Sequence, residues 1–294
     1  MKQPAQHAPP TSWIIALTMA FALLASFIYF ISTPGIVGDL PLLKKFHAEI
    51  DEHLAVPPTE RDRPRGVMLA SSGGMCAAEG PLKLSEAGPD LMILSFPIGT
   101  FDDFYPVAEK LVDRKPDFVI IQSSVLIDKS PLDHEYRLFV GAVNHLVRDK
   151  VLGNAPETYP DIHPRHICTD NRAPEEAWRY YKSQIDNKRS NQLSRASRAR
   201  IVDAFHSLNR AHIPIMIVDV PRYPDTEEYG HWVMARVRDL VANAQHPMHR
   251  VTYHAMSEVL PTERFIDPYH VMTSVRPLYR AWLYAEIHKA LNPP

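Results

Sequence analysis

Five short apolar runs recur along the chain between residues 65 and 254, and most of them are continuously apolar rather than alternating with polar residues. Strands that are buried on both faces of a parallel sheet have this pattern. We therefore expect strands at Gly66–Ala70, Leu91–Phe96, Phe118–Gln122, Ile213–Val220 and Arg250–His254.

Segments with apolar residues at helical spacing separate these runs. Alternating strands and helices predict a doubly wound α/β fold with right-handed crossovers. We expect a three-layer α/β/α domain with a central parallel sheet of about five strands, whose functional site lies beyond the carboxyl ends of the strands. The predicted helices are Phe104–Arg114, Leu138–Lys150, Ala173–His212, Tyr229–Gln245 and Arg276–Leu291, the last with an apolar face of Leu278, Trp282, Ala285 and Ile287.

The 18 residues from Ile14 to Ile31 contain no charge, and Trp13 and Tyr29 lie near the two ends of this run. A helix of that length is about 27 Å long, close to the thickness of the hydrocarbon core of a bilayer. Aromatic residues at both ends are typical of membrane interfaces. We expect a transmembrane anchor at residues 13–32, preceded by a tail at residues 1–12. The alternatives are a cleaved signal peptide, whose apolar core is usually about 7–15 residues long, and a buried core helix.

Residues 33–64 join this anchor to the predicted domain. Within them, Pro41–Ala55 has apolar residues at helical spacing, which predicts a stalk helix that packs on the domain or lies at the membrane surface. A charged, proline-containing stretch follows, so we place the domain at residues 65–294. Residues 151–172 are irregular and rich in Pro and His, which predicts an insertion that could cover the strand ends.

The charge balance argues against one broad class of function. There are 32 basic and 34 acidic residues, with a net charge of −2, so the chain has no overall attraction to nucleic acid. A basic cluster between Lys188 and Arg200 is interpreted as a solvated helix face, with contact to an anionic polymer or to lipid headgroups as the alternative. Cys76 and Cys168 fit either one disulfide in an oxidising compartment or two free thiols.

Candidate chemistry centres on Asp267 and His270, which are three residues apart with Pro268 between them. On a helical turn such a pair shares one face, and Pro268 suits the first position of that turn. A carboxylate there can accept the Nδ1–H of the imidazole and leave Nε2 free as a base. The alternative is an N-cap aspartate beside an incidental histidine.

Polar or glycine residues follow the other predicted strands as well. The first strand continues into Ser71–Gly74, so Ser72 can begin the next helix, where the helix dipole favours a developing negative charge. The second strand ends near Gly99, whose backbone N–H can approach a ligand closely, and the third ends in Gln122–Ser124. This convergence on one rim of one sheet favours a catalytic His270, although Ser71–Gly74 can also be a simple tight turn.

A metal site is the weakest of the candidates. His163 and His166, with Cys168 nearby, have a spacing that could suggest one, but they lie in the irregular stretch without a carboxylate partner. We expect neither a metal nor a cofactor.

With these blocks the chain resembles the SGNH (GDSL-like) hydrolase superfamily from about Arg65 to Leu291, and most resembles its membrane-anchored, DltD-like members. The resemblance implies an SGNH/flavodoxin-like fold, with Ser72 as nucleophile, His270 as base and Asp267 as its partner. It also implies that Gly99 is an oxyanion donor. The third block of the family, Gly-x-Asn-Asp, is replaced by QSSVLI from Gln122, and Ser123 or Ser124 could at best partly replace the missing Asn.

The resemblance implies a serine esterase or acyl (acetyl) transferase that acts on a cell-wall or exported polysaccharide. It further implies that the chain is held in the inner membrane with its domain outside the cytoplasm, alongside a multi-span membrane acyltransferase. The missing Asn leaves an alternative from another class, a weakly active or inactive protein that binds or assembles glycans in such a system.

Overall fold

The computed structural model of the chain describes residues 10–31, 41–78, 88–96, 101–126, 168–176, 178–179, 182, 195–242 and 251–292. The chain divides into two compact units, Met1–Lys44 with Glu135–Glu157, and Lys45–His134 with Thr158–Pro294. The second unit contains the whole sheet and the candidate site. The helix predicted at 138–150 and most of the insertion predicted at 151–172 lie outside the described residues.

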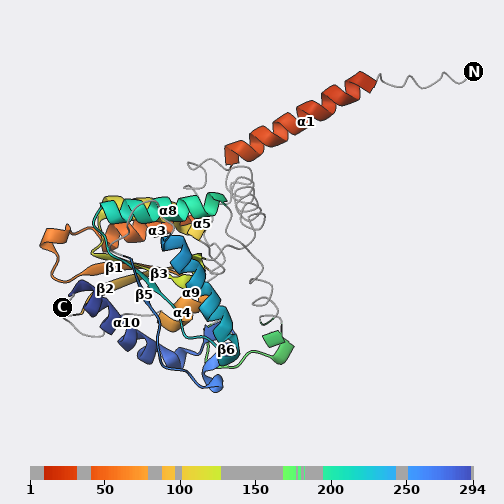
Figure 1. Cartoon of the computed structure of the whole chain (residues 1–294). Helices are drawn as coiled ribbons and strands as arrows, with labels where there is room; N and C mark the ends of the chain where they lie inside the picture. The colour runs from red at the N-terminus through yellow and green to blue at the C-terminus, as the bar shows by residue number, and fades with distance from the viewer. Residues whose placement is uncertain are drawn as a thin grey trace, which may run out of the picture. The chain divides into compact units, whose positions relative to one another are not determined.

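Five parallel strands form the central sheet in the order β2-β1-β3-β4-β5 (Figure 1). The predicted α/β class and central parallel sheet are therefore confirmed. The fourth strand is shorter than its apolar run, because Pro214 has no N–H to donate at the start of that run. The strands are β1 (Arg65–Ser71), β2 (Asp90–Phe96), β3 (Phe118–Gln122), β4 (Ile215–Val218) and β5 (Val251–His254).

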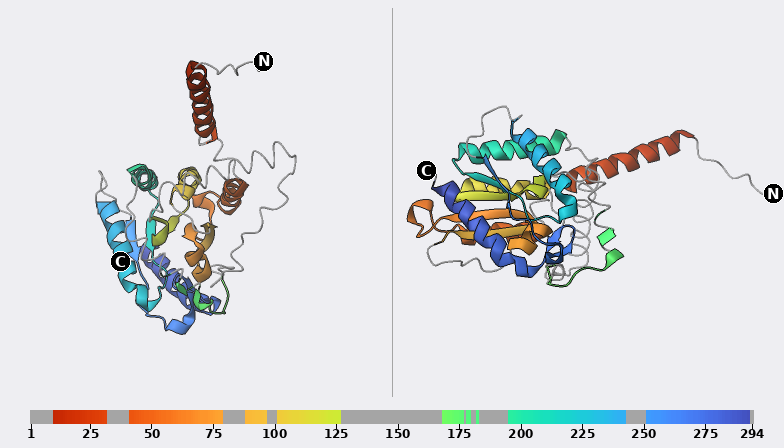
Figure 2. Two further views of the ribbon diagram at one scale, coloured as in Figure 1. Left: turned by 90° about the vertical axis from the view of Figure 1, so that its right-hand side faces the viewer. Right: turned by 60° about the horizontal axis from the view of Figure 1, so that its bottom comes forward.

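Helices cover both faces of the sheet. One face carries α3 (Pro41–His53), α5 (Phe101–Arg114) and α8 (Arg195–Arg210), and the other carries α4 (Ser72–Ala78) and α10 (Arg276–Leu291) (Figures 1 and 2). Helix α9 (Glu227–Ala242) connects β4 to β5 and contacts α8. Shorter elements are η1 (Pro58–Glu60), η2 (Ser123–Leu126), η5 (Pro224–Thr226), η6 (Thr262–Arg264), β6 (Phe265–Asp267), β7 (His270–Val271) and η7 (Thr273–Val275).

The core beneath α10 is built from alternate residues of the strands, as the two-residue period of a strand requires. Burying a large apolar side chain contributes about 1.5–3 kcal/mol, so this layer fixes α10 across the sheet. Its strand residues are Met68, Ala70, Phe118, Ile120, Met216 and Val218, and they pack with Tyr279, Leu283 and Ile287 of α10.

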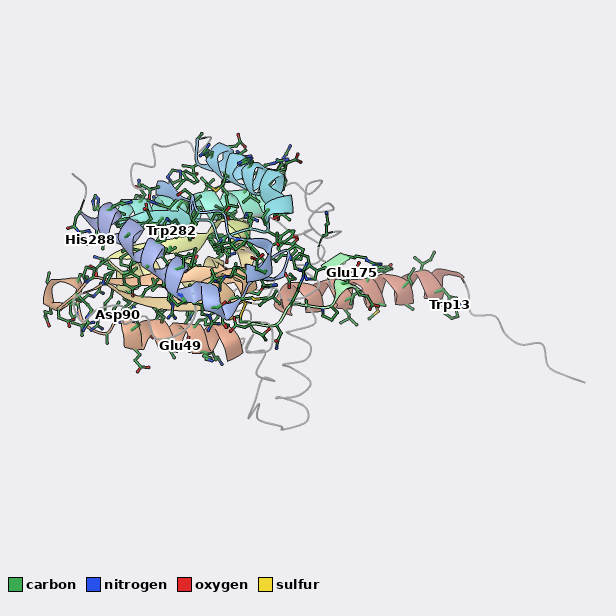
Figure 3. The ribbon with its side chains drawn as sticks, turned by 90° about the horizontal axis from the view of Figure 1, so that it is seen from below. Trp13, Glu49, Asp90, Glu175, Trp282 and His288 are labelled. Atoms are coloured by element: carbon green, nitrogen blue, oxygen red, sulfur yellow. A yellow bond between two sulfur atoms is a disulfide. The ribbon has the colours of Figure 1, made fainter. Side chains whose placement is uncertain are left out.

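The bounds predicted for α10 are confirmed, but its predicted apolar face is wrong at Leu278 and Ala285. Leu278 is 40% exposed and Ala285 is exposed, whereas Tyr279 and Leu283 are fully buried. Trp282, labelled on α10 in Figure 3, is partly buried against the core. The true face was missed because a tyrosine hydroxyl suggests a polar position, yet that of Tyr279 donates to the carbonyl oxygen of Asp219 at 3.4 Å.

The single helix predicted from Ala173 to His212 is also wrong at its start. Ala173 and Pro174 are not helical, and α8 spans Arg195–Arg210. The N–H of Ala173 donates to the carbonyl oxygen of Ile266 at 2.8 Å, so the chain at this point follows β6 instead.

Helix α3 packs on the domain, which was one of the two interpretations of the stalk. Phe46, Ile50 and Leu54 are buried. On its outer side, Asp51 Oδ1 lies 2.8 Å from Lys110 Nζ and 2.6 Å from Arg114 Nε of α5. These contacts extend the folded unit to the N-terminal side of the expected boundary at Arg65.

Helix α1 (Pro10–Ile31) belongs to the other unit. Its side chains are described from Trp13 to Ser26, and every one of them is exposed. In the part of the chain that the structure describes, no helix is both long enough and apolar enough to cross a membrane. The anchor at residues 13–32 stays a prediction.

Candidate active site

Ser72 is placed by a short connection between a buried strand and a helix of small residues. β1 is buried from Val67 to Ala70, and α4 begins at Ser72 itself. A Cβ at Gly73 would lie 3.2 Å from the backbone oxygen of Tyr269. A side chain next to Ser72 would therefore push by a few tenths of an ångström against the segment that carries His270.

Asp267 and His270 lie on opposite strands of a tight hairpin, not on a helical turn as predicted. β6 and β7 pair antiparallel with Asp267 opposite His270, and Pro268 is the first residue of the turn between them. Pro favours this position of a β-turn because its φ is already set. Asp267 Oδ1 accepts the backbone N–H of Tyr269 at 2.7 Å and that of His270 at 3.1 Å, so the same carboxylate also closes the turn.

The structure brings Ser72, His270 and Asp267 together. His270 Nε2 lies 2.9 Å from Ser72 Oγ, and His270 Nδ1 lies 2.9 and 2.8 Å from the two carboxylate oxygens of Asp267. Because a carboxylate only accepts, Nδ1–H donates to Asp267 and Nε2 accepts the hydroxyl proton of Ser72. Asp267 is 3% exposed and His270 5% exposed, so water competes little for these hydrogen bonds.

Gln122 holds the turn that carries Ser72, a role that sequence reasoning missed. Its Oε1 accepts the backbone N–H of Ser71 at 2.8 Å, the Ser71 hydroxyl at 3.1 Å and the backbone N–H of Gly74 at 3.0 Å. A side chain at position 74 would collide with this same oxygen, so only glycine leaves room for the hydrogen bond. The available signal was a lone amide side chain that ends the otherwise apolar strand β3.

Neither serine after Gln122 is directed at Ser72 by its hydrogen bonds. Ser124 Oγ accepts Gln122 Nε2–H at 2.6 Å and lies 3.2 Å from Ser71 Oγ. Ser123, which is fully buried, donates to Asp219 Oδ1 at 2.6 Å. Gly99, the other expected oxyanion donor, lies outside the described residues.

An ion pair between Asp219, which is buried, and Arg222, which is partly buried, lies at the carboxyl end of β4, and sequence reasoning missed it too. Arg222 Nη2 and Nε donate to the two oxygens of Asp219 at 2.6 and 2.9 Å, and the guanidinium lies 5.1 Å from the ring centroid of Tyr229. Burial opposes the charge, but Asp219 outweighs this effect and raises the pKa of Arg222. Asp219 also accepts the hydroxyl of Ser123, so the ion pair helps to hold the chain directly after Gln122.

Cys76 and Cys168 form a disulfide, which decides between the two alternatives for the cysteines. His163 and His166 lie outside the described residues. Within the described parts of the chain, no group of three or more His, Cys, Asp or Glu side chains could hold a metal ion.

No known family model matches the chain. No curated protein matches it either. Two solved structures are similar at low identity. A protein of Bacteroides fragilis, provisionally described as an acylhydrolase, is 12% identical with a TM-score of 0.47 over 85% of this chain and 97% of its own. A Streptococcus pneumoniae structure, provisionally described as a platelet activating factor, is 10% identical with a TM-score of 0.36 over 93% of this chain and 99% of its own. At such similarity the chemistry has to be argued from the residues of this chain.

Proposed function

We propose that this chain is an SGNH-type acyl-ester enzyme, a serine esterase or acyltransferase. Ser72 is the nucleophile, His270 the general base and then acid, and Asp267 the residue that orients His270. The observation that carries the proposal is the 2.9 Å separation of Ser72 Oγ from His270 Nε2, with both oxygens of Asp267 on Nδ1. Nucleophile, base and orienting group within hydrogen-bonding reach of one another are what acyl transfer through serine requires.

In the first half-reaction Ser72 Oγ attacks the acyl carbon while its proton passes to His270 Nε2. The tetrahedral intermediate collapses when the C–O bond to the alcohol breaks and His270 returns that proton to the leaving oxygen. In the second half-reaction water or a sugar hydroxyl attacks the acyl-serine, His270 takes its proton, and Ser72 is released with that proton. Water as the acceptor gives an esterase, and a sugar hydroxyl gives an acyltransferase.

Catalysis is expected to be slow, because the third-block Asn of the family has no counterpart. The carboxamide of Gln122, in that block, is already hydrogen-bonded to Ser71, Gly74 and Ser124. Gly99 is the proposed oxyanion donor, and the loss of a second donor lowers the rate about 10²–10³-fold. The same observation favours the alternative function, a glycan-binding or assembly protein that keeps the fold without efficient turnover.

The proposed location is the outer side of a cell membrane, with a polysaccharide as substrate and a multi-span acyltransferase as partner. The substrate and the partner are proposed from the resemblance alone, and two observations support the location. The Cys76–Cys168 disulfide suits an oxidising compartment, and α1 exposes large apolar side chains from Trp13 to Leu24, which a bilayer would cover. Alkaline phosphatase fused after residue 60 is expected to be active, and an inactive fusion would reverse the orientation.

The test of the reaction is covalent labelling of the full-length protein in detergent with a fluorophosphonate probe, which reacts with activated serines. We expect one adduct, located on Ser72 by peptide mass spectrometry, and no adduct in Ser72→Ala. Ser71→Ala is the matched control, because it removes the adjacent hydroxyl and leaves Ser72 beside His270. Absence of labelling in the folded native protein would reject the enzyme and favour the binding protein.

Turnover of p-nitrophenyl acetate then separates a slow enzyme from a protein that only traps the probe. Release of p-nitrophenol beyond one equivalent, lost in Ser72→Ala, is the result expected of an enzyme. Acetyl transfer to an oligosaccharide in the same reaction, detected by mass, distinguishes a transferase from an esterase.

A further inference from the structure

The segment Cys168–Ala173, here called the strap, is bonded covalently to the helix that carries Ser72. Cys168 forms its disulfide with Cys76, which lies on α4 one turn after Ser72. Cys76 is fully buried and Cys168 is 7% exposed, and both pack against Met75. One end of the strap is therefore fixed to the element that presents the nucleophile.

The same strap holds the segments that flank the His270 hairpin on both sides. The carboxylate of Asp170 accepts the hydroxyl of Thr273 at 2.6 Å and the backbone N–H of Ser274 at 2.8 Å. The N–H of Ala173 donates to the carbonyl oxygen of Ile266, the residue before Asp267, at 2.8 Å. Figures 1 and 2 draw this part of the chain in green beside β6, and it leads to the turn with Glu175 labelled in Figure 3.

We propose that the strap is a positioning device for the proposed acyl transfer, which sets His270 against Ser72 through the disulfide on one side and Asp170 on the other. This inference rests on the proposed function. Ser72 and His270 are 198 positions apart and are joined directly by a single hydrogen bond. A displacement of about 1 Å between reacting groups can lower a rate about 10²-fold, so a link from α4 to both flanks of the hairpin acts on the rate itself.

Helix α10 also holds α4, through Arg276 Nε on the carbonyl oxygen of Cys76 and Arg280 Nε on that of Ala78. These bonds reach the last turn of α4 from the chain that follows the hairpin. They keep α4 folded against the sheet when the strap is cut, so loss of the strap is expected to loosen the site without unfolding the domain.

A purely stabilising disulfide is the competing explanation, because a cross-link over 92 positions stabilises any fold by restricting the unfolded chain. The two explanations differ in which quantity changes. A stabilising link alters the melting temperature and leaves kcat of the folded protein unchanged. A positioning link lowers kcat well below the melting temperature and leaves KM nearly unchanged.

The experiment compares full-length Cys76→Ser/Cys168→Ser, Asp170→Ala and Asp170→Asn with the native protein. Rates of p-nitrophenyl acetate turnover and of Ser72 labelling are measured at a temperature where near-ultraviolet circular dichroism shows each variant folded. Asp170→Ala leaves the disulfide intact and changes an exposed side chain, so it keeps the test valid if the double variant does not fold. Asp203→Ala is the matched control, since Asp203 also accepts a hydroxyl hydrogen bond, that of Tyr105 at 3.0 Å, but on α8.

We expect about a tenfold or greater loss of kcat and of labelling rate in the double variant and in Asp170→Ala. Asp170→Asn should recover much of the loss, because its amide oxygen can still accept from the Ser274 N–H while its NH₂ group donates to the Thr273 hydroxyl oxygen. Asp203→Ala should match the native protein. Native rates in the folded Asp170→Ala variant would overturn the positioning role of the strap. Failure of Ser72 to label in the native protein would instead overturn the proposed function.

Discussion

The side-chain oxygen of Gln122 accepts the backbone N–H of Gly74 at 3.0 Å, across the gap between β3 and the first turn of α4. The same oxygen takes the N–H of Ser71, so the residue on each side of the Ser72–Gly73 pair is tied to a single carboxamide. The backbone geometry around Ser72 is thus fixed from the neighbouring strand β3.

Replacing Gln122 by Met keeps most of the volume but removes this acceptor. The N–H groups of Ser71 and Gly74 lose their shared partner, and an unsatisfied buried donor costs about 1–3 kcal/mol. We expect Gln122→Met to lower the free energy of unfolding by about 2 kcal/mol in urea titrations and to slow labelling of Ser72. Ser95→Ala is the control at the end of β2, because the Ser95 hydroxyl has no hydrogen-bond partner among the described residues. Equal losses in the two variants would argue against a role for the carboxamide.

Asp267→Asn tests the orientation of the base. An Asn side chain whose oxygen still accepts the backbone N–H groups of Tyr269 and His270 directs its NH₂ group towards His270 Nδ1. Nδ1 then accepts a hydrogen bond from this NH₂ group, so the imidazole proton lies on Nε2. Such a tautomer cannot take the Ser72 proton, and the same change in a serine protease triad lowers kcat about 10⁴-fold. We expect a loss of about 10³–10⁴-fold in turnover with an unchanged circular dichroism spectrum. Activity within a few-fold of native would remove Asp267 from the mechanism.

The Asp219–Arg222 pair is expected to show strong coupling in a double-mutant cycle. Removing one member leaves the other charge buried, which costs about 3–5 kcal/mol. Arg222→Met should therefore destabilise the protein by about that amount, and adding Asp219→Asn should restore much of the loss. Urea titrations of the native protein, both single variants and the double variant provide the cycle. Additive losses would mean that the two side chains act independently.

Glu286 provides a prediction for acid pH. Its carboxylate accepts Lys289 Nζ–H at 2.6 Å and contacts His254 Nδ1 at 2.7 Å, which links α10 to the end of β5. The hydrogen bond from Lys289, with a further one from His254, lowers the pKa of Glu286 below its ordinary value of 4.5. Because the pKa is lowered in the folded state, the ionised Glu286 contributes its full stabilisation at pH values above the ordinary pKa. This contribution is lost as the pH falls through the pKa of the folded state. The stability difference between the native protein and Glu286→Gln should thus shrink from pH 6 to pH 3, and a constant difference would contradict this assignment.

The sheet could be predicted because its strands are buried on both faces. A short, continuously apolar run such as Phe118–Gln122 is stable only where both faces are buried, as in the centre of a parallel sheet. The strand at this position has the predicted bounds. The face of α10 could not be predicted, because it depends on Tyr279, whose hydroxyl finds a backbone acceptor just after β4, at Asp219, only in the folded state.

The trio of Ser72, His270 and Asp267 could be predicted because each residue belongs to a local block with its own spacing. The hairpin that carries Asp267 and His270 could not, because a three-residue separation suits a helical turn and a β-turn equally well. Gln122 acts on Ser71 and Gly74, which are far away in the sequence, and no local pattern reports such a pairing. Arg222 and Asp219 are close in the sequence, but the contact of Asp219 with Ser123 joins distant parts of the chain.

The separation of Ser72 from His270 by 198 positions also determines when the site comes into existence. At a synthesis rate of about 5–20 residues per second, roughly 10–40 s pass between the emergence of the two residues. Throughout that interval Ser72 lacks its proposed base, while β3, β4 and β5 emerge in turn on one side of β1. On the proposed mechanism, Ser72 becomes reactive to the probe during synthesis or refolding only after the hairpin with His270 has packed against α4, and a chain that ends before His270 carries no serine activated to attack esters.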